Sequence, residues 1–179
     1  MARDEVHPFR FPADIRNLYA VEIGEPFPKC LRVTVAEGVP GAEEPLEIPL
    51  GDKTLDLGTA QPIEAGPSSR VYRFEWDHYV AYAVRNESYA AAEMGEDERD
   101  LFRIEPNSPF ADYVRATTVA SDKDPGPLTH WALDTLNHKI AVVSDTPPEI
   151  TQLDPNERVE LLVQSGWIEL GGEDDEDEF

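Results

Sequence analysis

The sequence predicts a β-rich α+β domain, in which an antiparallel sheet of about eight strands, either strongly curved or closed into a barrel, is joined by about three short helices. Segments of alternating apolar and polar residues recur along the chain, separated by loops that contain most of its 16 Pro and 11 Gly residues. Long helices do not alternate with these segments, which argues against a parallel Rossmann-type sheet.

The first third of the chain reads mainly as strands. Residues 15–23 begin with helical spacing and end with strand alternation, which favours a strand in their second half. Residues 30–36 alternate as a half-buried strand does and are rich in β-branched side chains. Residues 46–57 read as a hairpin with a turn at 51–53, and Pro49 places its first strand at a sheet edge or a bulge.

The longest strand signal runs from Arg70 to Arg85. Large apolar and aromatic residues keep one parity over all sixteen residues, although a single strand of this length is unusual. The segment either bends or breaks near Asp77-His78. Because the parity is unbroken and no Gly marks a turn, we expect one long, bent strand, followed by a short helix that begins at Asn86.

The second half predicts strands and helices in turn. A short strand is expected at 101–104, and two further strands, 128–134 and 139–144, flank a turn. Ser108-Pro109 and Asp154-Pro155 each place a capping side chain before a Pro at the first helical position, so a helix is expected after each pair.

The elements predict a single globular domain over residues 1–170. Residues 1–14 read as a possible extended arm, and residues 171–179 as a disordered acidic tail, because six consecutive acidic residues follow Gly171-Gly172. We find neither a signal-peptide pattern nor an apolar run of 18 residues, so the expectation is a soluble, cytoplasmic protein without membrane contact.

The balance of charge is strongly acidic. Asp and Glu number 37 against 15 Lys and Arg, which gives a formal charge of −22. This sign argues against binding to nucleic acid or to an anionic membrane. Only four of the basic residues are Lys, and an acidic, Lys-poor surface is typical of adaptation to high salt; drift in base composition also favours Arg over Lys. A functional acidic surface is the alternative.

No catalytic or metal-binding motif is present, so no metal and no cofactor is expected. The candidates for acid–base chemistry are His78, His130 and His138, with Asp77 or Asp134 as the carboxylate that orients the imidazole. Structural or surface roles are the preferred interpretation of these histidines.

The single cysteine, Cys30, excludes an internal disulfide. It would need a lowered pKa to serve as a nucleophile, and an inert thiol is the preferred interpretation.

Aromatic side chains supply the ligand-binding candidates. Tyr72, Trp76, Tyr82 and Trp131 would line a cavity if the sheet curled into a barrel, whereas an ordinary core is the preferred alternative.

Arginines offer a different kind of site. Arg103 could build an anion site with Arg85 and Tyr113, although pairing with the abundant carboxylates is preferred.

These observations favour binding of an unidentified small molecule or protein partner. The alternatives are an enzyme that acts on a small polar substrate by His/Asp chemistry, and an acidic inhibitor or nucleic-acid mimic. The sequence also allows a homodimer, formed through the Pro49 hairpin or through residues 7–12.

Overall fold

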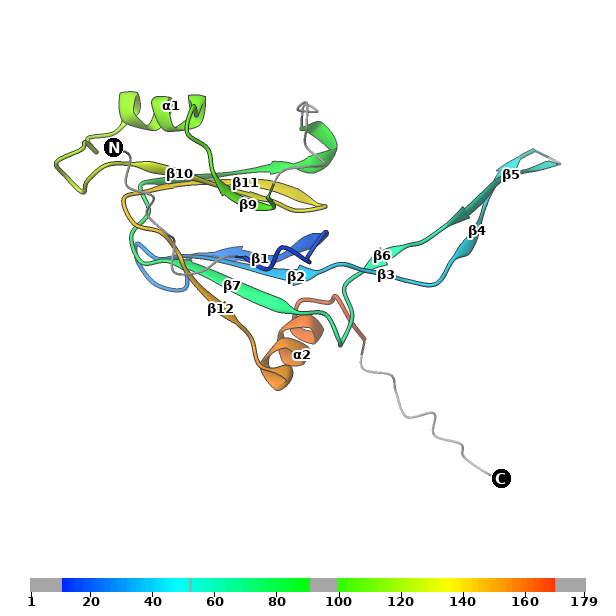
Figure 1. The fold of residues 1–179 in the computed structure, drawn as a ribbon. Helices are drawn as coiled ribbons and strands as arrows, with labels where there is room; N and C mark the ends of the chain where they lie inside the picture. Colours follow the sequence, from blue (N-terminus) through cyan, green and yellow to red (C-terminus); the bar gives the residue numbers. More distant parts are fainter. Residues whose placement is uncertain (1–10, 52, 91–99, 170–179) are drawn as a thin grey trace.

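The computed structural model describes residues 11–51, 53–90 and 100–169. Most of their strands lie in two four-stranded antiparallel sheets, which form two layers in Figure 1. Sheet I has the order β1-β2-β7-β12, with β1 at Leu18–Gly24, β2 at Leu31–Glu37, β7 at Val71–Trp76 and β12 at Glu149–Gln152. Sheet II has the order β8-β11-β10-β9, with β8 at Ala81–Asn86, β9 at Phe102–Ile104, β10 at Thr129–Asp134 and β11 at His138–Ser144.

Helices and small strand pairs complete the fold. Helix α1 (Pro109–Thr117) lies over the outer face of sheet II, and α2 (Pro155–Gln164) lies under the outer face of sheet I (Figure 1). The other elements are the pair β3 (Val39–Pro40) and β6 (Ile63–Glu64), the hairpin β4 (Glu44–Leu50) and β5 (Lys53–Ala60), and the 3-10 turn η1 (Glu87–Tyr89).

The main core lies between the two sheets. Tyr72, Phe74 and Trp76 alternate with outward residues along β7 and are buried in the sandwich. Phe102 of sheet II contacts Phe74 edge to face, with 5.0 Å between ring centroids, and stacks on Trp131 at 5.9 Å. Aromatic contacts therefore tie the two sheets together across the core.

The predicted fold class is confirmed in its coarse form, and its details are corrected. The domain is β-rich with antiparallel sheets, but none of them closes into a barrel. The described residues hold twelve strands and two α-helices, where about eight and three were expected. Strands β3, β6 and β12 were not predicted, because a strand of only two to four residues is too short to show a detectable alternation of apolar and polar residues.

The prediction of one long strand over 70–85 was wrong. The chain leaves sheet I after Trp76, crosses at 77–80 and enters sheet II as β8, where the Val80 N–H donates to the Val143 carbonyl at 2.8 Å. Tyr82 and Val84 lie opposite the core residues of β11. Both strands present the same parity to one shared core, so the parity continues across the break.

The two helix starts were predicted correctly. The Ser108 hydroxyl accepts a hydrogen bond from the Ala111 N–H at 2.9 Å, and the Asp154 carboxylate accepts from the N–H groups of Asn156 and Glu157. The hairpin of 128–144 is also confirmed, with Thr129 paired to Ser144 and Asp134 paired to Lys139.

Three predictions fall wholly or partly outside the described residues. They are the arm at 1–14 in its first ten residues, the acidic tail at 171–179, and the continuation beyond residue 90 of the helix expected after Asn86, where the structure shows η1. Among the described residues, no helix combines the length and the apolar character needed to span a bilayer.

Candidate functional site

A pocket of about 520 Å³ lies on the outer face of sheet II, beside the N-terminal end of α1. Strand alternation explains its lining. Trp131 and Leu133 of β10 point into the sandwich core, so His130, Ala132 and Asp134 point outward and border the pocket. The volume lies in the range of about 300–1,000 Å³ that small-molecule sites have.

Alanine side chains form the floor of this pocket. The register pairs Ala83 of β8 with Ala141 of β11, and Ala141 with Ala132 of β10, so three methyl groups lie side by side across three strands. Ala132 is paired in turn with Arg103 of β9. Because no long side chain rises from the alanine row, the sheet is hollowed at this point.

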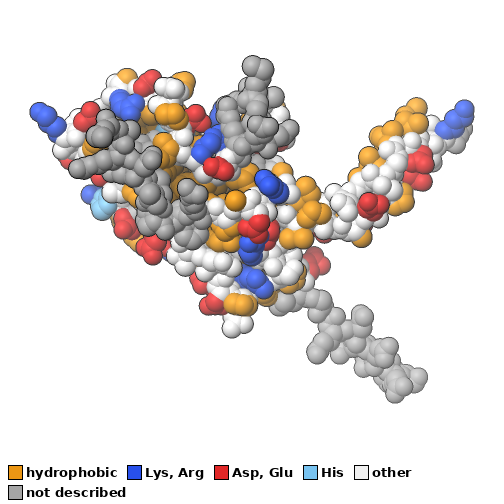
Figure 2. Space-filling view, in the orientation of Figure 1, with side chains coloured by type: hydrophobic (Ala, Val, Ile, Leu, Met, Phe, Trp, Pro, Cys, Tyr) orange, Lys and Arg blue, Asp and Glu red, His pale blue; other side chains and the backbone are white. Residues whose placement is uncertain are grey.

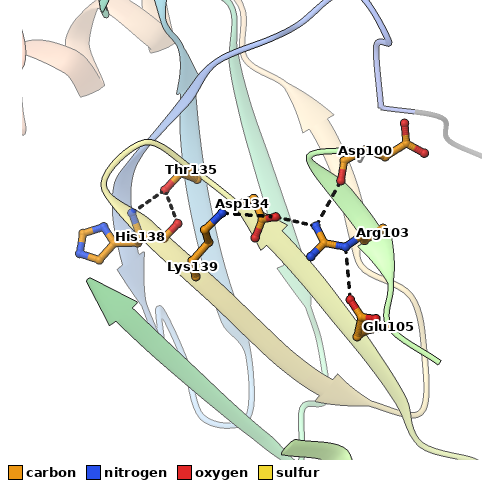
Figure 3. A network of polar contacts seen from close by, with 7 residues as sticks. All are labelled: Asp100, Arg103, Glu105, Asp134, Thr135, His138 and Lys139. Carbon is orange, nitrogen blue, oxygen red and sulfur yellow. Dashed lines mark hydrogen bonds and ion pairs between the residues drawn. The ribbon is translucent and has the colours of Figure 1, made fainter. Parts of the chain in front are cut away.

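A row of charged residues borders the alanine floor. Arg85, Lys139 and Asp134 are cross-strand neighbours, two residues along their strands from the three alanines. Asp134 Oδ2 lies 2.6 Å from Arg103 Nη1 and 3.6 Å from Lys139 Nζ (Figure 3). The side chains of Arg103, Asp134 and Lys139 are only 15–19% exposed, so these ion pairs are partly shielded from water.

Arg103 is held in place by several acceptors. Besides Asp134, its Nε donates to Glu105 at 3.3 Å and its Nη1 donates to the Asp100 carbonyl at 3.3 Å (Figure 3). Burial alone would lower the pKa of Arg103, but the hydrogen bond and charge of Asp134, with the charge of Glu105, outweigh burial and raise it. The Nη2 group of Arg103 makes no hydrogen bond to any residue in the described part of the chain.

Arg85 differs from Arg103. It lines the same pocket and is exposed, and within residues 11–51, 53–90 and 100–169 its side chain has neither an ion pair nor a hydrogen bond. Its strand neighbour Lys139 faces Asp134 instead. The guanidinium of Arg85 is therefore available to a ligand.

His130 is a titratable residue of the lining whose ring is largely buried. Both of its ring nitrogens are buried without a hydrogen-bond partner among the described residues, and the ring contacts Phe110 edge to face at 5.8 Å. Burial lowers the pKa of His130, Glu105 opposes this change, and the charges of Arg103 and Arg85 lower it further. The imidazole is thus neutral at pH 7 and presents one donor and one acceptor.

The first residues of α1 border the pocket as well. Asn107, Ser108 and Pro109 line it, and the dipole of the helix gives this end a partial positive charge. The lining contains three basic residues, Arg85, Arg103 and Lys139, and two acidic residues, Glu105 and Asp134. With His130 neutral, the lining has a formal charge of 3 − 2 = +1, in a chain of −22.

Several residues singled out in the sequence meet in this pocket. Arg85, Arg103, His130 and Asp134 all line it. However, His130 and Asp134 lie four residues apart on β10, which separates them by about 13 Å along the strand, and no hydrogen bond joins them. Tyr113, expected beside the arginines, is 63% exposed on α1 and does not line the pocket.

The aromatic candidates lie elsewhere. Tyr72, Trp76 and Trp131 are at most 4% exposed and belong to the sandwich core, where Trp131 donates its indole N–H to Ser144 at 2.9 Å. Tyr82 faces the edge of the same core and contacts Tyr79. The cavity expected inside a barrel is replaced by a packed core between two sheets.

The other acid–base candidates do not converge either. His78 and Asp77 are exposed in the crossing between β7 and β8. His138 begins β11 beyond the pocket lining, next to the turn where Thr135 bonds its backbone (Figure 3). No hydrogen bond between a histidine and a carboxylate occurs within the described ranges.

Cys30 is fully buried, and its thiol is not activated. Burial raises its pKa, as do the charges of Glu75 and Asp77, while Arg32 opposes them. This environment favours the inert thiol over the nucleophile. In the described part of the chain, no three His, Cys, Asp or Glu side chains form a group that could hold a metal ion.

Sequence reasoning did not select Lys139, Glu105 or the alanine row as site residues. The signal for the alanines was present in the small residues at 81 and 83, on the parity opposite the aromatic one. Their significance depends on the register with Ala132 and Ala141, which only the pairing of distant strands supplies.

Comparisons of the chain with protein-family models, with curated proteins and with solved structures give no match. The geometry of the pocket is accordingly the basis for the functional proposal.

Proposed function

We propose that this domain binds a small anionic molecule, with a carboxylate or phosphate group, in the pocket on the outer face of sheet II. One observation supports this most strongly: Arg85 lines the pocket and has no partner in the described part of the chain. In a chain with 37 acidic and 15 basic residues, carboxylates are abundant, yet none of the described ones pairs with Arg85. A bound anion would satisfy its guanidinium.

Arg103 supports the same ligand class in a different way. Asp134 and Glu105 fix its guanidinium, so little side-chain entropy is lost when a ligand binds to it. Its free Nη2 group and the Arg85 guanidinium both belong to the pocket lining. Two guanidinium groups, one fixed and one exposed, suit an anion with at least two acceptor oxygens.

The neutral groups of the pocket favour a ligand that also has hydroxyl groups. His130 lines the pocket, and its two ring nitrogens have no hydrogen-bond partner among the described residues. Asn107 and Ser108 add polar contacts at the start of α1. The alanine floor gives the carbon skeleton of such a ligand an apolar surface to lie on.

Calorimetric titration with inorganic phosphate and with succinate tests the proposal. Replacement of Arg85 by Ala removes a charge-assisted hydrogen bond worth about 1.5–3 kcal/mol, so the affinity is expected to fall at least tenfold. Arg16→Ala is the matched control, because Arg16 is also exposed and without a partner among the described residues, but it lies before β1. Equal affinities of the wild type and the Arg85→Ala variant would contradict the proposal.

The two alternatives from the sequence stay predictions. The enzyme hypothesis requires a carboxylate hydrogen-bonded to one of the candidate histidines, and no such hydrogen bond occurs among the described residues. The mimic hypothesis requires acidic residues gathered on one face, whereas Figure 2 shows carboxylates scattered among basic and hydrophobic side chains on the visible face.

A further inference from the structure

The hairpin β4–β5 is an arm that projects from the sandwich (Figure 1). The two strands pair only with each other and form a separate two-stranded sheet within the described part of the chain. All described residues of both strands are exposed. An isolated two-stranded hairpin is at best marginally stable in water, so this arm is expected to gain stability from a covering surface.

The two faces of the arm differ in polarity. Ile48 lies opposite Leu55, and Leu50 lies opposite Lys53, while Glu47 lies opposite Asp56 on the other face. The apolar face forms a stripe, and Figure 2 shows hydrophobic side chains along the length of the arm. The stripe consists of five aliphatic residues that are 44–66% exposed: Leu46, Ile48, Leu50, Leu55 and Leu57.

The stripe has opposite charges at its two ends. Glu44 has the parity of Leu46 and Ile48, and it lies at the base of the arm. Lys53, opposite Leu50, lies at the tip. If two arms lie antiparallel with their stripes in contact, Lys53 of each copy reaches the Glu44 end of the other. A twofold axis then makes the contact self-complementary and closed.

We propose that the stripe is covered by the same stripe of a second copy of this chain. Pro45 and Pro49 remove two backbone donors from β4, which disfavours association by adding strands edge to edge and leaves the apolar face as the contact surface. Five half-exposed side chains offer a few hundred Å², below the about 800 Å² per partner of a standard interface. The dimer is therefore weak and concentration-dependent.

Sedimentation velocity on the chain of residues 1–179, from about 1 to 200 µM protein in 0.15 M NaCl, tests this proposal. The wild type is expected to shift from a monomer of 20.0 kDa towards twice that mass as the concentration rises. Ile48→Glu places a charge in the stripe and is expected to weaken the dimer at least twentyfold. Thr54→Glu adds the same charge to the opposite face of the arm and is expected to change the dimer affinity less than threefold.

A charge exchange tests the antiparallel arrangement specifically. Lys53→Glu brings like charges together and is expected to weaken the dimer about fivefold or more. Adding Glu44→Lys to this variant restores opposite charges and is expected to recover most of the affinity. The near-ultraviolet circular dichroism of the core Trp residues reports whether each variant keeps its fold.

Three results would overturn the proposal. The first is a wild-type monomer at all concentrations, which would leave the arm to a different partner. The second is a dimer that Ile48→Glu does not weaken. The third is a failure of the Glu44→Lys exchange to rescue Lys53→Glu, which would exclude the antiparallel contact.

Discussion

The two sheets share one core, but helices cover their outer faces to different extents. On sheet I, α2 packs over Ala36 and Val71 and buries Leu162 completely. On sheet II, α1 packs Val114 against Val143, while the alanine row beyond the first turn of the helix borders a pocket. The covered face stabilises the fold, and the incompletely covered face holds the pocket in which we propose that an anion binds.

The arginines of the two outer faces differ in the same way. On sheet I, Arg32 pairs with Glu75 at 2.9 Å, and Arg73 pairs with Glu157 of α2 at 2.8 Å. On sheet II, Arg103 is paired, whereas Arg85 has no partner among the described residues. A basic side chain without a partner among the described residues is the reason why we propose the outer face of sheet II as the binding face.

The largest expected effect comes from the helices that cover the two faces. Leu162→Ala removes the fully buried side chain of α2 and is expected to lower the free energy of unfolding by about 2–5 kcal/mol. Val114→Ala on α1 removes fewer buried methyl groups and is expected to cost about 1.5–2.5 kcal/mol. Urea denaturation followed by circular dichroism measures both values.

A control separates packing from helix propensity in this comparison. Tyr113→Ala changes an exposed residue of α1, so it is expected to alter the free energy of unfolding by less than about 0.5 kcal/mol. A greater loss for Val114→Ala than for Leu162→Ala would contradict the assignment of sheet I as the more completely covered face.

The same substitution on each face gives a sharper contrast. Ala36 is fully buried under α2, so Ala36→Leu is expected to overpack this layer and lower the free energy of unfolding by about 1–3 kcal/mol. Ala141→Leu fills part of the pocket floor instead and is expected to leave stability within about 0.5 kcal/mol while it abolishes phosphate binding. If both variants lost stability equally, the pocket floor would be part of a packed layer.

The pH dependence of stability reports on the buried imidazole of sheet II. The folded-state pKa of His130 lies below its ordinary value of 6.5, so the unfolded chain binds more protons as the pH falls through 6.5. The free energy of unfolding is therefore expected to decrease as the pH falls from 6.5 to the folded-state pKa of His130. Below that pKa, His130 is expected to cause no further decrease. Denaturation between pH 7 and 5 measures this decrease.

Two variants identify the histidine responsible. His130→Asn is expected to flatten the decrease between pH 7 and 5, whereas His78→Asn, at an exposed position, is expected to leave it unchanged. The carboxylate of Glu37 does not interfere, because the hydrogen bond from Arg70 lowers its pKa below 4.5. The stability that Glu37 contributes is therefore lost at a lower pH than the range of this measurement. An identical profile for wild type and His130→Asn would refute the interpretation of His130.

The smallest expected effect is that of salt on thermal stability, and it does not distinguish the two sheets. If the acid excess is an adaptation to salt, screening by KCl from about 0.1 to 3 M should reduce self-repulsion of the −22 chain and raise the melting temperature by several degrees. Thermal melts followed by circular dichroism measure this change. A melting temperature that stays constant or falls would count against adaptation to salt as the cause of the acid excess.

Local signals in the sequence were sufficient for several elements of the fold. The Ser108-Pro109 and Asp154-Pro155 caps and the hairpin between β10 and β11 were predicted, because each depends on residues that are near in sequence. The break between β7 and β8 was not, since residues on both sides of it face the same core. Whether a strand stays in one sheet depends on long-range pairing, which alternation alone does not encode.

The candidate site was predictable only in fragments. Arg85 and Arg103 were considered together as an anion site, and His130 and Asp134 as an acid–base pair, but only the register shows that all four line one pocket and that the last two do not touch. The aromatic residues gave the stronger sequence signal and lie in the core. The weaker signal of alternating alanines marked the pocket floor.

Chemical-shift mapping of the amide groups of the ¹⁵N-labelled chain during a phosphate titration tests the central claim most directly. The anion-binding account predicts saturable shifts clustered at residues 83–85, 103–108 and 130–141, and their loss in the Arg85→Ala variant. Shifts centred on the outer face of sheet I, or a cluster on sheet II that survives Arg85→Ala unchanged, would contradict it.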